Sequence, residues 1–145
     1  MGQLAYDLGN VYQIPHVPRI HNSSVLFHLL QGAVADEERF KNVTAEDFTA
    51  TLERIDAILA QLDDARMACP DADLIKREFA NAGRLLQHAC RRALQLLGEE
   101  TDNATMLADL EATIEEHTAL WLARNRPGGL EGSLKRFDAL RKAYT

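Results

Sequence analysis

The residues best suited to chemistry stand at one corner of the chain, where two arginines precede two glycines. Arg124 and Arg126 are followed by Gly128 and Gly129, directly before a new apolar pattern. Guanidinium groups and the free N–H groups at a helix start both favour anions, so a carboxylate or phosphate could bind here. Alternatively, the arginines lock the corner by pairing with nearby carboxylates: Glu115, Glu116 or Glu131. The four residues are therefore a candidate anion site or a structural corner.

The five histidines do not form a metal-binding pattern. His16, His21 and His28 share one region, but they have no helical i, i+4 spacing and no carboxylate at a zinc-like interval. His88 and His117 fall on separate expected helices. We therefore expect no metal site and no cofactor, with histidines at the edge of a core.

Adjacent acidic residues are the remaining candidates for catalysis. The pairs considered are Asp36-Glu37, Asp63-Asp64 and Glu115-Glu116. Neighbours on a helix point about 100° apart, so such a pair cannot flank one scissile bond. The sequence also lacks a nucleophile elbow, a phosphate-binding glycine loop, C-x-x-C and H-E-x-x-H. We predict no catalytic residue in this chain.

Three long amphipathic helices are expected to position the corner. Each begins at residues that can cap free N–H groups: Thr44 with Asp47, Asp71 or Asp73 after Pro70, and Asp102 or Asn103. Apolar residues then recur at steps of three and four: Phe48, Leu52, Ile55, Leu59 and Leu62; Ile75, Phe79, Ala82, Leu86, Ala89, Ala93 and Leu97; Leu107, Leu110, Ile114, His117 and Trp121. In the second helix, small residues such as Gly83 would let a neighbouring helix approach closely.

The corner itself ends the third helix. Pro127 cannot donate to a helical hydrogen bond and biases Arg126 away from the helical region, so the helix stops near Asn125. Trp121 lies one turn earlier, where its indole can anchor the arriving helix to the departing one with its N–H near polar loop atoms. The last helix carries a further apolar stripe: Leu130, Leu134, Phe137, Leu140 and Tyr144.

These patterns predict an all-α fold, an up-down bundle of three long helices plus a shorter C-terminal helix. One short helix over residues 25–30, capped by Asn22, Ser23 or Ser24, and an irregular N-terminal segment pack on it. We expect a single domain over residues 1–145, with a docking segment at 1–22 and the bundle at 23–145. The abrupt start in an apolar segment suggests a fragment of a longer enzyme. Cys69 and Cys90 are expected to be reduced, and a disulfide between them stays open.

The charge and hydropathy of the sequence argue against two classes of partner, nucleic acids and membranes. Sixteen basic against 22 acidic residues give a net charge of -6, which argues against nucleic acid. No apolar run approaches the roughly 18 residues of a membrane span, so we expect no membrane partner. The start of the chain lacks the pattern of a signal peptide, which favours the cytoplasm without fixing the compartment. An oligomer is left open.

Two stretches of sequence resemble a known family. Residues 121–131 read WLARNRPGGLE and residues 6–12 read YDLGNVY. Together they resemble the helical region that follows the catalytic barrel in bacterial proteins of glycoside hydrolase family 20, the β-N-acetylhexosaminidases. Gly132 and Ser133 follow where an acidic residue and then Ser would be expected.

The resemblance implies a parent enzyme that removes terminal N-acetylhexosamine residues with an Asp-Glu pair on a barrel strand. That pair has no counterpart here, because Asp36-Glu37 does not match the motif and no barrel is present. The implied role is a non-catalytic C-terminal accessory domain whose partner is the catalytic barrel. A free-standing helical protein-interaction module is the alternative, and a small helical enzyme or sensor using the anion site is a third hypothesis.

Overall fold

The computed structural model describes residues 1–17, 23–32 and 42–145, and these ranges form helices and no strand. In chain order the elements are α1 (Gly2–Asn10), the 3₁₀ turn η1 (Val11–Gln13), α2 (Val25–Leu30), α4 (Ala45–Leu59), α5 (Ala72–Leu96), α6 (Asn103–Arg124), α7 (Leu130–Leu134), the 3₁₀ turn η2 (Lys135–Phe137) and α8 (Asp138–Tyr144). The predicted all-α bundle with three long helices is confirmed. Within these ranges, every helix falls short of the length or apolarity that crossing a bilayer requires.

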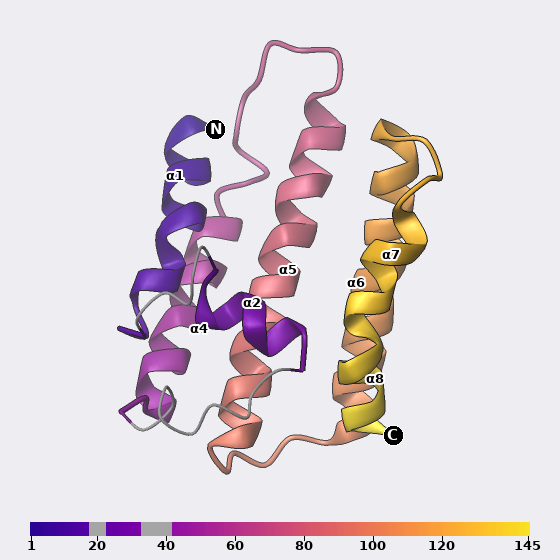
Figure 1. Cartoon of the computed structure of the whole chain (residues 1–145). Coiled ribbons are helices and arrows are strands. Elements are labelled where there is room, and N and C mark those ends of the chain that lie inside the picture. The colour runs from indigo at the N-terminus through magenta and orange to yellow at the C-terminus, as the bar shows by residue number, and fades with distance from the viewer. Residues whose placement is uncertain (18–22, 33–41) are drawn as a thin grey trace.

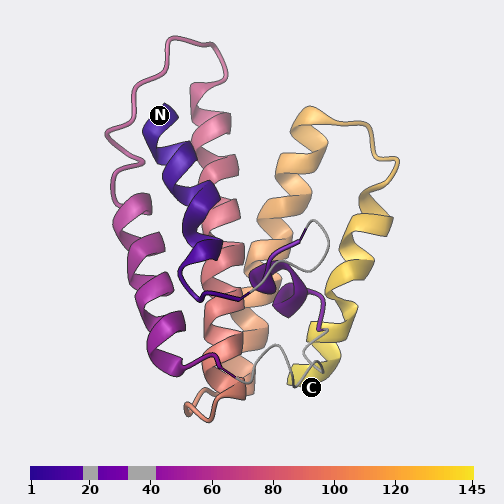
Figure 2. The ribbon, with the colours of Figure 1, turned by 60° about the vertical axis from the view of Figure 1, so that its left-hand side comes forward.

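Helix α5 is the centre of the bundle. Helices α1 and α4 lie on one side of it, and α6 with the α7–α8 segment lies on the other (Figure 1). Helix α2 packs against α5 as well. The N-terminus, the loop between α4 and α5 and the corner between α6 and α7 lie at the same end of the molecule (Figure 2).

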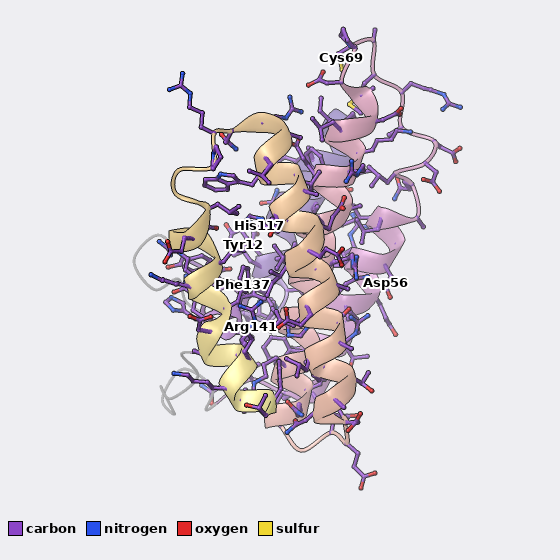
Figure 3. The ribbon with its side chains drawn as sticks, turned by 90° about the vertical axis from the view of Figure 1, so that its right-hand side faces the viewer. Tyr12, Asp56, Cys69, His117, Phe137 and Arg141 are labelled. Atoms are coloured by element: carbon purple, nitrogen blue, oxygen red, sulfur yellow. The ribbon has the colours of Figure 1, made fainter. Side chains whose placement is uncertain are left out.

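The apolar interior is divided between the two sides of α5. One cluster draws on α1, η1, α2, α4, the turn after α4 and α5: Leu4, Leu8, Val11, Val25, Leu26, Leu29, Phe48, Ile55, Ile58, Leu62, Ala89, Cys90 and Ala93. The other draws on α6, η2 and α8: Met106, Leu110, Ile114, Phe137, Leu140 and Tyr144. Asp56 of α4 and Arg141 of α8 lie on opposite sides of the bundle (Figure 3). Both sides of α5 are therefore covered by other helices. The single apolar stripe predicted for this helix does not account for all the side chains that it buries.

Most helix starts follow the predicted capping residues. Thr44 and Asp47 form a reciprocal capping box, and their hydrogen bonds lower the pKa of Asp47. Ser24 accepts from the backbone N–H of Phe27, and Asp102 accepts from that of Thr105. Asp71 precedes α5 without forming a side-chain cap. Its carboxylate is held by another residue, described below.

The N-terminal segment is more regular than predicted. Residues 2–13 form α1 and η1, and Leu4, Leu8 and Val11 are buried against α4 and its neighbours. Their spacing is that of one helix face, which Gly2 and Gly9 obscured in the sequence. The sequence predicts an irregular segment over residues 1–22 in which residues 6–12 could form a helical turn or two. In the structure the helical part extends over residues 2–13. His21, Asn22 and the pair Asp36-Glu37 lie outside the described residues.

The C-terminal helix is also less uniform than predicted. It is divided into α7, η2 and α8, although Phe137, Leu140 and Tyr144 of the predicted stripe are buried. A 3₁₀ turn tightens the winding, so it shifts which residues of the segment share one face.

Close approach of α4 and α5 depends on Gly83, as its small size predicted. A Cβ atom built at Gly83 would lie 2.6 Å from both Cδ atoms of Leu59. Every larger side chain there must displace Leu59 or separate the two helices.

We predict that Gly83→Leu lowers the free energy of unfolding by about 1–3 kcal/mol, because it overpacks the α4–α5 contact. Gly9→Leu is the matched control, since Gly9 is also helical and has no atom within 4 Å of a built Cβ. Urea unfolding measures both variants. Equal midpoints for the two would contradict the close packing at Gly83.

Candidate functional site

The corner after α6 is closed by Trp121. Its indole Nε1–H donates to the carbonyl of Arg126 at 3.1 Å, which confirms the predicted proximity to polar loop atoms. Gly129 has a φ of 87°, a backbone conformation that favours glycine, and a Cβ there would lie 3.3 Å from the Trp121 ring. The indole therefore fits against the glycine corner, which turns the chain into α7.

Arg124 is tied to the start of α5 and the loop before it. Its Nε and Nη2 donate to the two carboxylate oxygens of Glu78 at 2.7 and 3.0 Å, and its Nη1 donates to Asp71 at 2.5 Å. The bond from Arg124 lowers the pKa of Asp71, and the two carboxylates raise the pKa of Arg124. This three-residue cluster holds the end of α6 against the beginning of α5.

The predicted partners of the corner arginines were wrong. Glu116 is bound by Arg77 at 2.9 Å, and Glu131 is paired with Lys135 at 2.8 Å. Residues 71 and 78 reach Arg124 because α5 and α6 run antiparallel, which places the start of one beside the end of the other. The residues near the corner in the sequence do not show how α5 and α6 will be aligned.

The corner gives little support to an anion site. The Arg124 guanidinium is shared by two carboxylates, so the cluster carries one net negative charge. Arg126 is exposed and has no carboxylate partner among the described residues, and Gly128 and Gly129 are exposed too. Helix α7 has only five residues, so its dipole is short. The arrangement favours the structural reading of the corner.

A groove of about 230 Å³ lies between α5 and α6 next to this cluster. The residues that matter most in its lining are Asn81, Leu85, His117, Trp121, Arg124 and Asn125. Asn81 is only 3% exposed, and its Oδ1 has no hydrogen-bond donor in the described part of the protein. An unpaired buried carbonyl costs stability, so this position is unusual.

His117 forms one wall of the groove. Its Nε2 lies 3.1 Å from the hydroxyl of Ser133, and its ring is 6.0 Å from that of Trp121 and 6.3 Å from that of Phe137. His117 and Phe137 meet where α6 faces the C-terminal segment (Figure 3). Burial lowers the pKa of His117, so its imidazole is neutral at pH 7.

A second polar cluster, missed in the sequence, lies inside the bundle. His88 is fully buried, with Nδ1 2.8 Å from Asp109 and Nε2 3.0 Å from the Tyr144 hydroxyl. Arg91 reaches Asp109 at 3.4 Å, and the Arg92 guanidinium carbon lies 5.3 Å from the centre of the Tyr144 ring. The cluster joins α5, α6 and α8. The sequence predicts a position at the edge of a core for His88. It does not show the cluster, because the partners Asp109 and Tyr144 lie on other helices.

An acid, a histidine and a hydroxyl in a row are the parts of a nucleophilic triad, but the burial of the histidine and the hydroxyl argues against catalysis by this cluster. No substrate can reach His88, whose exposed fraction is zero. Burial raises the pKa of Tyr144 to about 12, so the phenol stays protonated. The bond from His88 lowers the pKa of Asp109. The cluster therefore holds three helices together.

Cysteines and other metal-binding side chains form no further candidate site within residues 1–17, 23–32 and 42–145. No group of three or more His, Cys, Asp or Glu residues there could hold a metal ion. Cys69 and Cys90 are both free, and burial raises the pKa of Cys90 to about 12. Cys69 lies in the loop at the end of the molecule, ahead of α5 (Figure 3).

No family model, curated protein or solved structure matches this chain. The resemblance to glycoside hydrolase family 20 therefore rests on residues 6–12 and 121–131 alone.

We predict that Arg124→Gln lowers the midpoint of urea unfolding, since it leaves Asp71 and Glu78 without their shared guanidinium. The loss should shrink in high salt, which screens the same charges. Arg126→Gln removes an equal charge from a residue that has no carboxylate partner among residues 1–17, 23–32 and 42–145, and it should leave the midpoint unchanged. Equal effects of the two variants would show that the Arg124 cluster does not hold the corner.

We predict that Tyr144→Phe lowers the free energy of unfolding by about 1–2 kcal/mol, because His88 Nε2 is left buried and unpaired. Because the phenol titrates near pH 10 when unfolded and near 12 when folded, the unmodified protein loses stability across that window as pH rises. The variant should lose less stability over the same pH window. The loss that remains comes from the Cys90 thiol, whose pKa is also raised by burial.

The control is Tyr6→Phe, since Tyr6 is 68% exposed. Urea unfolding at neutral and alkaline pH measures both variants. A Tyr144→Phe protein as stable as the control would contradict the buried hydrogen bond.

Proposed function

We propose that this chain is a non-catalytic accessory domain of a glycoside hydrolase, a helical bundle that supports a catalytic barrel. The observation that carries the proposal is the burial of His88 and Tyr144 in the Asp109–His88–Tyr144 cluster. The groups best suited to acid–base or nucleophilic chemistry are used to join helices. A supporting role fits such a chain better than turnover.

The two stretches that resemble family 20 support the same reading, because both build the domain. Residues 6–12 complete α1 and begin η1, which packs on α4. Residues 121–131 form the corner that Trp121 closes. A resemblance carried by such segments favours a shared domain architecture over a shared active site.

The apolar residues of the N-terminal segment serve mainly this domain. Leu4, Leu8 and Val11 are buried in its own core, whereas Tyr6 stays 68% exposed on α1. Tyr6 is therefore the side chain of that segment best placed to contact a neighbouring barrel.

The free-standing interaction module remains the alternative. Its docking surface would need contiguous apolar residues. In the part of the chain that the structure describes, the exposed large apolar side chains are distributed over α1, α2, the end of α5 and α6: Tyr6, Phe27, Leu96, Leu97 and Leu122. This distribution gives the accessory role more support than a helix-binding groove.

We predict that the isolated chain does not hydrolyse a chromogenic N-acetylglucosaminide, while a catalytic β-N-acetylhexosaminidase assayed in parallel does. The native reading frame should encode a barrel upstream of Met1. Turnover by the isolated chain, absent from a mock purification, would contradict the proposal, and so would a reading frame without a barrel.

A further inference from the structure

Helix α7 buries less of itself than the rest of the C-terminal segment does. None of its five residues is buried, although Leu134 lies partly buried against the cluster formed by α6, η2 and α8. By contrast, η2 and α8 bury Phe137, Leu140 and Tyr144. An element with few buried side chains opens at a lower free energy than the core beside it.

The two glycines before α7 can act as a hinge. Trp121 fixes the corner at the carbonyl of Arg126, and Gly128 and Gly129 follow before α7 begins. Gly129 has a φ of 87°, and no described atom lies within 4 Å of a Cβ built at Gly128. Because glycine reaches more backbone conformations than other residues, these two positions can absorb a movement of α7.

His117 of α6 supplies the polar contact that holds α7 in place. Its Nε2 lies 3.1 Å from Ser133 Oγ, and within residues 1–17, 23–32 and 42–145 this is the side-chain hydrogen bond that joins α7 to α6. The imidazole lies beside the rings of Trp121 and Phe137, with ring centres 6.0 and 6.3 Å away. Two aromatic rings and one hydroxyl replace little of the water that an imidazolium needs, so this position favours the neutral ring.

The charged side chains near His117 on α5, α6, α7 and η2 are mostly paired with one another. Three ion pairs take up the carboxylates: Arg77 with Glu116, Arg124 with Glu78, and Lys135 with Glu131. The other charged groups of these elements in this region, Arg84 and Arg136, are positive. No carboxylate of this set is left to stabilise an imidazolium, and burial lowers the pKa of His117 below its ordinary value of 6.5.

We propose that protonation of His117 opens α7, so that this short helix acts as a pH-sensitive flap on α6. Opening returns the imidazole to water, where its pKa is ordinary, so the open form binds more protons than the closed form. As pH falls from 6.5 toward the lower pKa of the closed form, the open population rises by at most about tenfold per pH unit. Helix α8 stays docked through Tyr144 and the bond from Arg141 to Glu111.

Hydrogen exchange of the Ser133 amide, followed by NMR on the 145-residue chain, tests the proposal. This N–H donates to the carbonyl of Gly129 at 3.0 Å, so it exchanges when α7 opens. Its protection factor compares the exchange rate with that of an unstructured peptide at the same pH. Between pH 7.5 and 5.5 this factor should fall by about threefold or more, while the amides of α8 keep their protection.

His117→Gln should abolish this pH dependence, because glutamine does not titrate and can still form a hydrogen bond with Ser133. His117→Phe takes its place if glutamine leaves α7 open at every pH, since phenylalanine keeps a ring beside Phe137. The matched control is His16→Asn. His16 is exposed with a φ of 53°, which asparagine tolerates, so this variant should respond like the unmodified chain.

Three results would overturn the proposal. One is Ser133 protection that does not change with pH, and another is a pH response that persists in the folded His117 variant. The third is loss of protection in α8 together with α7, which would make the whole C-terminal segment the moving unit. The flap requires no catalytic barrel, so this test is independent of the reading frame that decides the proposed function.

Discussion

The fold depends on α5 being covered on two opposite sides. Toward α4 it presents small residues, and Gly83 brings its backbone close to Leu59. Toward α6 and α8 it presents the buried His88, whose two ring nitrogens find Asp109 and Tyr144. A helix placed between two cores needs close apolar packing on one side, and any polar group on the other must be satisfied. One element thereby joins both halves of the bundle.

What the sequence predicted well is local. Capping at Thr44 and Ser24, the apolar stripe of α4 and the tryptophan corner each depend on residues within a few turns of one another, whereas Ala82 and Leu97 of the stripe predicted for α5 are exposed. What it predicted badly depends on register between distant helices. The partners of Arg124 lie about fifty positions away in the chain, and those of His88 stand on two other helices. Periodicity in one helix cannot show which turn of a neighbour will face it.

The candidate site follows from the same register. Antiparallel pairing of α5 with α6 brings Glu78 to Arg124 and leaves the groove with Asn81 in its lining. The sequence identified Trp121 and Arg124, but the burial of Asn81 was not visible, because a polar residue on a helix is expected to be exposed. Its burial with no donor for Oδ1 among the described residues is unfavourable for stability.

The claim that α5 makes the two cores one cooperative unit can be measured by native-state hydrogen exchange in increasing denaturant. Backbone amides of α5 near His88, of α4 near Ile55 and of α6 near Leu110 should exchange with one common free energy, equal to that of global unfolding. Exchange of the α6 amides through a separate opening of much lower free energy, while those of α4 and α5 stay protected, would contradict the account.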